Sequence, residues 1–306
     1  MEDQAPQDQT GLTVDLLLEK LHPARKTCIV DVGANPINEA PYSDLLRRGG
    51  CTVVGFEPQQ DAYDALLKSK TDAETYYPFA VGDGSPANLK MFRSSGMTSI
   101  FEPYVKGLAL LGRPSLVKVL RRIPFETVAL DAVPDLPEFD LLKIDIQGGE
   151  NLVFNGAERV LAACTVVIVE LRYQRLYEEE PMMGGVDTEL RRQGFGLHKF
   201  MFNKSLALPN SQSARLRPKL LADHLVDGDA VYIRNIAEPE KLSDQQLIHL
   251  ALLAASVFFS HSLVLYCLDA LVQRGIVDQD LPRAYADRLP EKLRSHRWSH
   301  DDSAAP

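Results

Sequence analysis

The chain has 306 residues, of which 45% are hydrophobic and 25% are charged, and its formal net charge is −9 at pH 7. This length suits one large domain with a small appendage, and the composition is that of an ordinary globular protein. The acidic balance disfavours a broad nucleic-acid-binding face, because such faces are basic. The composition therefore predicts no nucleic-acid partner.

Apolar runs alternate with helical patterns along most of the chain, which is typical of an α/β fold with a parallel sheet. The first residues lack an apolar core, so a disordered lead-in is predicted at 1–12. Strands are predicted at 27–32, 51–56, 76–81, 89–93, 125–130, 139–145, 164–169, 195–201 and 230–234. Helices are predicted at 13–21, 42–49, 61–70, 151–163 and 187–193.

Two stretches do not fit this alternation. Residues 100–122 are mixed and partly basic, so we expect a mobile cover or an irregular insertion there. Residues 247–268 carry no formal charge and on length alone could span a bilayer. Because Ser260, His261 and Ser262 interrupt this run, we expect a helical hairpin within 243–274 and no stable membrane insertion.

The predicted organisation is a main domain at 13–236, a helical extension at 237–298 and a disordered tail at 299–306. An exposed face on the helical pair would make a homodimer possible. The cysteines lie in apolar runs without metal-ligand or disulfide-framework spacing, which indicates buried free thiols in a reducing cytoplasm. They are Cys28, Cys51, Cys164 and Cys267.

Acidic residues end the first two predicted strands. The first strand delivers Asp31 to a turn at Gly33, and the second ends at Glu57. The carboxyl ends of parallel strands form a ligand-binding edge, and an acid at the second tip can accept both hydroxyls of a ribose. Gly33 is expected to let a ligand approach the main chain. This pattern suits a nucleoside with little phosphate charge, such as S-adenosylmethionine.

A dinucleotide-dependent oxidoreductase is the nearest rival, and solvated loop acids are the plainest alternative. A dinucleotide site normally has three closely spaced glycines that cradle a pyrophosphate. Here Gly33 is followed by Ala34, Asn35 and Pro36, and Asp31 would repel a pyrophosphate.

Further acids follow later strands. Asp83 lies between two glycines and could meet an adenine amino group, although a plain Asp-Gly turn explains it equally well. Asp145 follows a buried strand, and Glu170 ends the next one. Glu150 opens the following helix, where an acid can simply complement the helix dipole.

Several stretches together resemble the FkbM-type S-adenosylmethionine-dependent methyltransferases. The most specific is Lys-Ile-Asp-Ile-Gln-Gly-Gly-Glu at 143–150. The others are residues 30–35, 55–58, 155–158 and 229–234. The resemblance implies a class I methyltransferase fold, which is Rossmann-like. Its sheet has seven mostly parallel strands with one antiparallel strand, and helices cover both faces.

The resemblance also implies O-methylation of a hydroxyl on a sugar, a glycan or a natural-product small molecule. Asp145, Glu150 and Glu170 would surround the transferred methyl group, with Asp145 as the first candidate base. The implied cofactor-binding residues are Asp31, Gly33, Ala34, Asn35, Glu57, Pro58 and Asp83. The family usually has a second glycine near Ile37, so Pro36 and Pro41 reshape that turn here.

Two alternatives remain open beside this interpretation. The carboxylates could hold a divalent cation that orients a diol, although no metal ligands are assigned. The chain could also be a non-catalytic protein of the same fold that binds a cofactor or a glycan.

Overall fold

The structure is a computed structural model that describes residues 7–295, without the side chains of residues 7–10 and 95. The chain divides into two compact units. The larger unit consists of Cys28–Ala40 and Cys51–Glu238. The smaller unit is helical and combines the N-terminal segment to Thr27 with Pro41–Gly50 and the segment from Pro239 onward.

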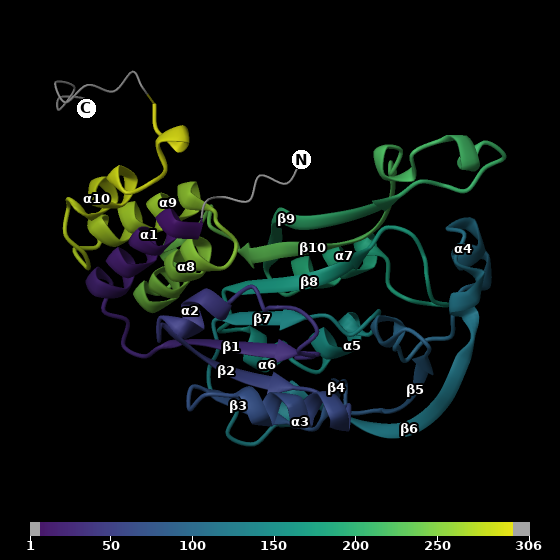
Figure 1. The fold of residues 1–306 in the computed structure, drawn as a ribbon. Coiled ribbons are helices and arrows are strands. Elements are labelled where there is room, and N and C mark those ends of the chain that lie inside the picture. Colours follow the sequence, from purple (N-terminus) through teal and green to yellow (C-terminus); the bar gives the residue numbers. More distant parts are fainter. Residues whose placement is uncertain (1–6, 296–306) are drawn as a thin grey trace. The chain divides into compact units, whose positions relative to one another are not determined.

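The larger unit is built on a seven-stranded sheet in the order β3-β2-β1-β7-β8-β10-β9 (Figure 1). β1, β7 and β8 pair in parallel, as do β2 and β3, whereas β10 is antiparallel to both of its neighbours. The predicted fold, with one antiparallel strand, is therefore confirmed. The strands are β1 (Thr27–Val32), β2 (Cys51–Phe56), β3 (Glu74–Tyr77), β7 (Leu141–Ile144), β8 (Val166–Arg172), β9 (Phe195–Leu206) and β10 (His224–Arg234).

Three helices cover one face of this sheet, because the apolar side chains of β1, β7 and β8 on that face need to be buried. They are α5 (Glu150–Asn155), α6 (Glu158–Leu161) and α7 (Met183–Arg192). α3 (Gln60–Ser69) connects β2 to β3. The single helix predicted at 151–163 is wrong: it is broken at Gly156, where a Cβ would lie 2.3 Å from the carbonyl oxygen of Gly82.

The strand predicted at 76–81 is also wrong, because it is split between two sheets. β3 ends at Tyr77, and β4 (Ala80–Gly82) pairs with β6 (Val119–Ala129) instead. Pro78 lies at the break, where a residue without an N–H suits a chain that leaves the sheet. β6 also pairs with β5 (Pro86–Phe92), which completes a three-stranded sheet of order β4-β6-β5.

The expected insertion at 100–122 contains α4 (Val105–Leu110) and the start of β6. It is ordered around a small core of its own, since Leu108 and Leu111 are buried against Phe92, Met97 and Tyr177. The segment 102–104 also lies along residues 176–178 through backbone hydrogen bonds such as Tyr104 N to Leu176 O (2.8 Å).

The smaller unit is a group of helices. They are α1 (Gln7–Lys20), α2 (Ser43–Arg47), α8 (Asp244–Ser256), α9 (His261–Gln273) and α10 (Leu281–Asp287). Ser243 and Gln246 form a reciprocal capping box at the start of α8. Residues 247–256 of α8 are all buried, so this helix needs neighbours on every side, and α1 and α9 pack against it.

This arrangement corrects the predicted boundaries. Residues 7–12 belong to α1, and α1 groups with the C-terminal helices rather than with the main domain. The remainder of the predicted lead-in, and the tail predicted at 299–306, lie outside the described residues. The hairpin within 243–274 is confirmed as α8 and α9. No helix within 7–295 has the length and apolar character needed to cross a membrane.

Candidate active site

Asp31 is the last acid of β1, and it lies beside a lysine of the neighbouring strand. Its register partner is Lys143 of β7, whose Nζ is 3.2 Å from Asp31 Oδ1. Burial by itself would lower the pKa of Lys143, but the carboxylates of Asp31 and Asp145 outweigh burial and raise it. The strand tip therefore carries an ion pair between a buried carboxylate and a half-buried ammonium group.

Glu57 follows β2 and is only 2% exposed. Its Oε1 accepts a hydrogen bond from the backbone N–H of Gln59 (2.8 Å), and its own N–H donates to Tyr77 O (3.1 Å). Burial raises the pKa of Glu57, and the charge of Asp31 adds to this shift. Within residues 7–295, no hydrogen bond to Glu57 Oε2 is formed, so this oxygen suits a hydroxyl donor such as a ribose.

Gly33 adopts a positive φ of 82°, as the sequence indicated. The side of Gly33 on which a Cβ would stand faces the turn after β7. A Cβ at this position would lie 2.3 Å from the carbonyl oxygen of Asp145, and the N–H groups of Gly33 and Ala34 both donate to Phe56 O (3.0 and 3.1 Å). The glycine thus lets the turns after β1 and β7 pass each other. Asn35 is half-buried and Pro58 exposed.

Asp83 does not lie at a tip of the seven-stranded sheet, because it follows β4 in the second sheet. It is exposed, and its Oδ1 accepts a hydrogen bond from the N–H of Ser85 (2.9 Å). The side chain of Asp83 thus bonds to the backbone two residues later. This is the plain Asp-Gly turn that the sequence analysis gave as the alternative to an adenine contact.

Glu150 closes the turn that follows β7. Its Oε1 accepts hydrogen bonds from the N–H groups of Ile146 (3.2 Å) and Gly148 (3.1 Å). Burial raises the pKa of Glu150, although backbone hydrogen bonds, including the one from Gly148, oppose the shift. Glu150 is 3% exposed, so its side chain stabilises the turn and is not accessible to a methyl acceptor.

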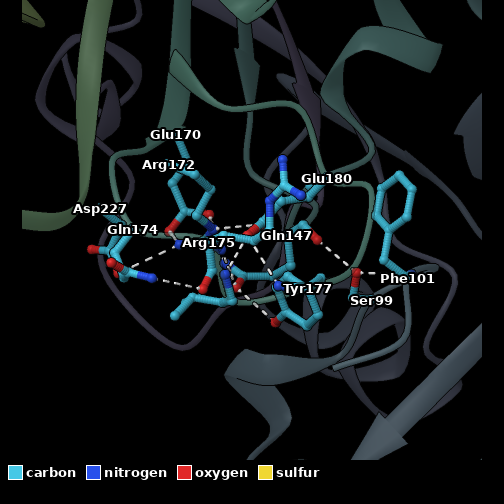
Figure 2. A network of polar contacts seen from close by, with 12 residues as sticks. Ser99, Phe101, Gln147, Glu170, Arg172, Gln174, Arg175, Tyr177, Glu180 and Asp227 are labelled. Atoms are coloured by element: carbon cyan, nitrogen blue, oxygen red, sulfur yellow. Dashed lines mark hydrogen bonds and ion pairs between the residues drawn. The ribbon is translucent and has the colours of Figure 1, made fainter. Parts of the chain in front are cut away.

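Glu170 and Arg172 stand two residues apart on β8 and form the centre of a polar network (Figure 2). Arg172 contacts both oxygens of Glu170 (3.0 and 2.8 Å) and donates to Gln147 Oε1 (2.6 Å). Gln147 Nε2 in turn donates to Glu170 Oε2 (2.8 Å) and to Asp145 Oδ1 (2.9 Å). Burial raises the pKa of Glu170 well above its usual range, and the charge of Asp145 adds to the shift.

Arg172 also balances two acids from other segments. Its Nε is 3.4 Å from Glu180 Oε2, and its guanidinium is 3.4 Å from Asp227 Oδ2 on β10. Lys204 on β9 reaches the same Asp227 oxygen at 3.1 Å. Arg172, Glu180 and Asp227 are all buried, so the charge of each depends on the charges of the other two.

Three carboxylates form a row on one face of the sheet. Ile144 pairs with Val169, so Asp145 follows in register with Glu170, and Glu170 pairs with Asp229 on β10. Burial, together with the nearby charge of Asp145, raises the pKa of Asp229 to about 6.

Sequence reasoning singled out Asp145 and Glu170 but missed the residues around them. These are Gln147, Arg172, Glu180, Asp227 and Asp229. The signal available was polar residues inside otherwise apolar strands, as in β8 and β10.

We expect Asp229→Asn to make stability less dependent on pH. A folded-state pKa near 6 means that ionising Asp229 disfavours the folded state progressively from about pH 4, where an ordinary aspartate ionises, to about pH 6. The free energy of unfolding of the variant, relative to wild type, should therefore rise over this interval and then level off. Urea titrations at several pH values measure it.

The exposed Asp223→Asn serves as the control for this measurement. A pH-independent difference between Asp229→Asn and wild type would show that Asp229 ionises normally in the folded protein.

The carboxylates do not form an evident metal site. Within the described residues, no group of three or more His, Cys, Asp or Glu side chains is placed to hold a metal ion. Asp31, Glu170, Glu180 and Asp227 instead pair with Lys143 or Arg172.

Strand order and the acids at the tips define a class I, Rossmann-like methyltransferase fold. The methyltransferase FkbM domain matches residues 31–197, more than half of the chain. The chain therefore belongs to the FkbM methyltransferase family, as the sequence motifs predicted.

Solved structures with a similar fold are distant in sequence. The magnesium protoporphyrin IX methyltransferase from Synechocystis PCC 6803, with bound SAM, is 9% identical, with a TM-score of 0.34 over 75% of this chain and 79% of that chain. Methyltransferase FkbM from Methylobacillus flagellatus KT is 12% identical, with a TM-score of 0.36 over 74% of this chain and 55% of that chain. The chain thus spans little more than half of the latter protein. No curated protein matches the chain.

Proposed function

We propose that this chain methylates a hydroxyl group of a sugar, a glycan or a natural-product small molecule, with S-adenosylmethionine as the methyl donor. The observation that carries the proposal is the juxtaposition of Asp145, directly after β7, with Glu170 on β8, at the same sheet edge as Asp31 and Glu57. A cytoplasmic location is part of the proposal, and the four buried free cysteines support it.

The cofactor is proposed to lie along the tips of β1 and β2. Asp31, Gly33, Ala34 and Asn35 would line its methionine part. Glu57 would hold the ribose hydroxyls through the carboxylate oxygen that Gln59 leaves free, next to Pro58.

An aromatic ladder offers a surface for the adenine in place of Asp83. Phe56, Tyr77 and Phe79 stack with centroids 5.6 Å apart at each step, and Phe79 is 39% exposed. Because Glu57 N donates to Tyr77 O, this ladder adjoins the proposed ribose site. Asp83 is left out because its carboxylate bonds to its own turn.

Asp145 is the proposed general base. When bound, S-adenosylmethionine supplies an activated methyl group on a good, neutral leaving group, so the protein's main tasks are alignment and removal of the hydroxyl proton. Asp145 is half-buried, and within 7–295 only its Oδ1 receives a hydrogen bond, which leaves Oδ2 for the acceptor. Glu170 is the second candidate base, because Arg172 contacts both of its oxygens. Glu150 is assigned the role of stabilising the turn.

Calorimetric titration with S-adenosylmethionine, S-adenosylhomocysteine and NAD tests the class, followed by turnover assays on sugar and polyketide hydroxyls. Micromolar binding of the first two, none of NAD, and methylation of a hydroxyl acceptor are expected. Cofactor binding without turnover on any hydroxyl would favour a non-catalytic binding protein, and binding of NAD alone would favour an oxidoreductase.

Glu57→Ala should weaken S-adenosylmethionine binding by more than tenfold, which corresponds to about 1.4 kcal/mol, because the ribose loses its carboxylate acceptor. Calorimetry measures the dissociation constant. Asp61→Ala, which removes an exposed acid from the first turn of α3, is the matched control and should bind normally. Equal affinity in both variants would rule out Glu57 as a cofactor ligand.

A further inference from the structure

Gln147 is held in an unusual backbone conformation at the centre of the polar network. Its φ is +61°, in the left-handed region that non-glycine residues seldom occupy. The hydroxyl of Ser99 donates to its carbonyl oxygen (2.7 Å), and Glu150 bonds to the N–H groups on either side of it. The surrounding structure thus fixes a strained residue, a combination that is concentrated at functional sites.

The amide orientation of Gln147 is determined by its partners. Nε2 donates to Asp145 Oδ1 (2.9 Å) and Glu170 Oε2 (2.8 Å), which accept, and Oε1 accepts from Arg172 (2.6 Å), which can only donate. The hydroxyl of Tyr177 is also near Oε1 (3.4 Å), but its single proton has a closer acceptor in Met97 O (2.9 Å). A flipped amide would place its oxygen against two carboxylates.

One nitrogen therefore bridges two carboxylates from different strand ends. Two carboxylates this close disfavour each other's ionisation, and a shared donor offsets the repulsion. The bridge uses one oxygen of Asp145 and leaves the other free of hydrogen bonds from the described residues. A glutamate at this position would instead add a third carboxylate.

We propose that Gln147 is a positioning residue whose amide holds Asp145 and Glu170 as an oriented pair, with the second oxygen of Asp145 directed to the acceptor hydroxyl. The inference rests on the proposed function in so far as Asp145 is the base. Other charged groups that face this pair are Lys143, Glu150, Arg172, Asp227 and Asp229.

The test compares Gln147→Leu, which keeps the approximate volume but removes both donors, with wild type. We expect kcat to fall about 100-fold, while KM and the calorimetric dissociation constant for S-adenosylmethionine stay within twofold. Because a lost donor disfavours the charged base, the rising limb of the pH–kcat profile should move to higher pH. A merely structural role would lower stability without moving this limb.

A second readout does not depend on activity. Carboxyl-carbon NMR titration, with the Asp145 signal assigned from Asp145→Asn, should give a higher midpoint for Asp145 in Gln147→Leu than in wild type. Gln193→Leu is the matched control, since Gln193 Nε2 also donates to a carboxylate, Glu189 Oε1 (2.7 Å), and to Phe154 O (2.9 Å). That variant should leave both the midpoint and kcat unchanged.

Gln147→Asn covers the case in which the leucine variant does not fold. Asparagine tolerates the left-handed backbone but is one methylene short of bridging both carboxylates. The Asp145 midpoint should therefore rise in this variant as in the leucine variant. An unchanged Asp145 midpoint and unchanged kcat in the folded variants would overturn the positioning role while hydroxyl methylation stands. If wild type methylates no hydroxyl, the proposed function fails, and the NMR midpoint still decides whether Gln147 sets the state of Asp145.

Discussion

Asp145→Asn should lower kcat by about 10²–10⁴-fold, the usual contribution of a general base, and leave the dissociation constant of S-adenosylmethionine nearly unchanged. Asparagine keeps the size of the side chain and can still bond to Gln147, but it cannot take the hydroxyl proton. Its carbonyl oxygen replaces the Oδ1 that accepts from Gln147 Nε2 at 2.9 Å. Steady-state kinetics and calorimetry on the same preparation separate the two effects.

Glu170→Gln provides the comparison for this prediction. Both oxygens of Glu170 are occupied by Arg172, and Gln147 adds a third bond, so we expect a smaller loss of kcat than in Asp145→Asn. Wild-type turnover in Asp145→Asn would remove Asp145 from catalysis. A larger loss in Glu170→Gln would transfer the role of base to Glu170.

Arg172→Met should destabilise the protein by about 3–5 kcal/mol, the cost of leaving buried charges without their partner. Arg172 is 3% exposed and is the shared cation of Glu170, Glu180 and Asp227. Acids on every side raise the pKa of Arg172 despite its burial, which shows how strongly the network favours its charge. Methionine keeps the stem but supplies no charge. Denaturant unfolding measures the loss.

The loss in Arg172→Met should depend on pH. Burial raises the pKa of Glu170 and Glu180 in the folded state, and removing the guanidinium raises both further. At low pH these carboxyls take up protons, so the cost shrinks; at higher pH they are ionised without a partner, and it grows. The exposed Arg217→Met is the control. A pH-independent loss, or one below about 1 kcal/mol, would mean that the pairs around Arg172 contribute little.

Most of the sheet could be predicted from the sequence because buried parallel strands are short apolar runs with clear ends. The predictions for β1 and β2 match the observed bounds, and Asp31, Glu57 and Asp145 lie where β1, β2 and β7 end. Parallel strands deliver their carboxyl ends to one edge, so a common edge for Asp31, Glu57 and Asp145 followed from the predicted parallel sheet.

The predicted elements were wrong where a segment contacts a part of the chain that is distant in sequence. The strand at 76–81 has a continuous pattern in the sequence, but β4 leaves the main sheet to pair with β6, and this took Asp83 away from the strand tips. Likewise the helix predicted at 151–163 breaks at Gly156, where a Cβ would lie 2.3 Å from the carbonyl oxygen of Gly82. Neither partner can be identified from the local pattern.

The sequence by itself determined the family, the class of fold and most of the strands with the acids at their ends, since these depend on local hydrophobic pattern and on motifs contiguous in the chain. Only the tertiary structure decided what each acid does. The antiparallel pairing of β10 with β8 brings Asp227 to Arg172 and Asp229 to Glu170, and the turn after β7 folds Gln147 between Asp145 and Glu170. The ionisation of a buried carboxylate depends on such neighbours, which come from distant parts of the chain.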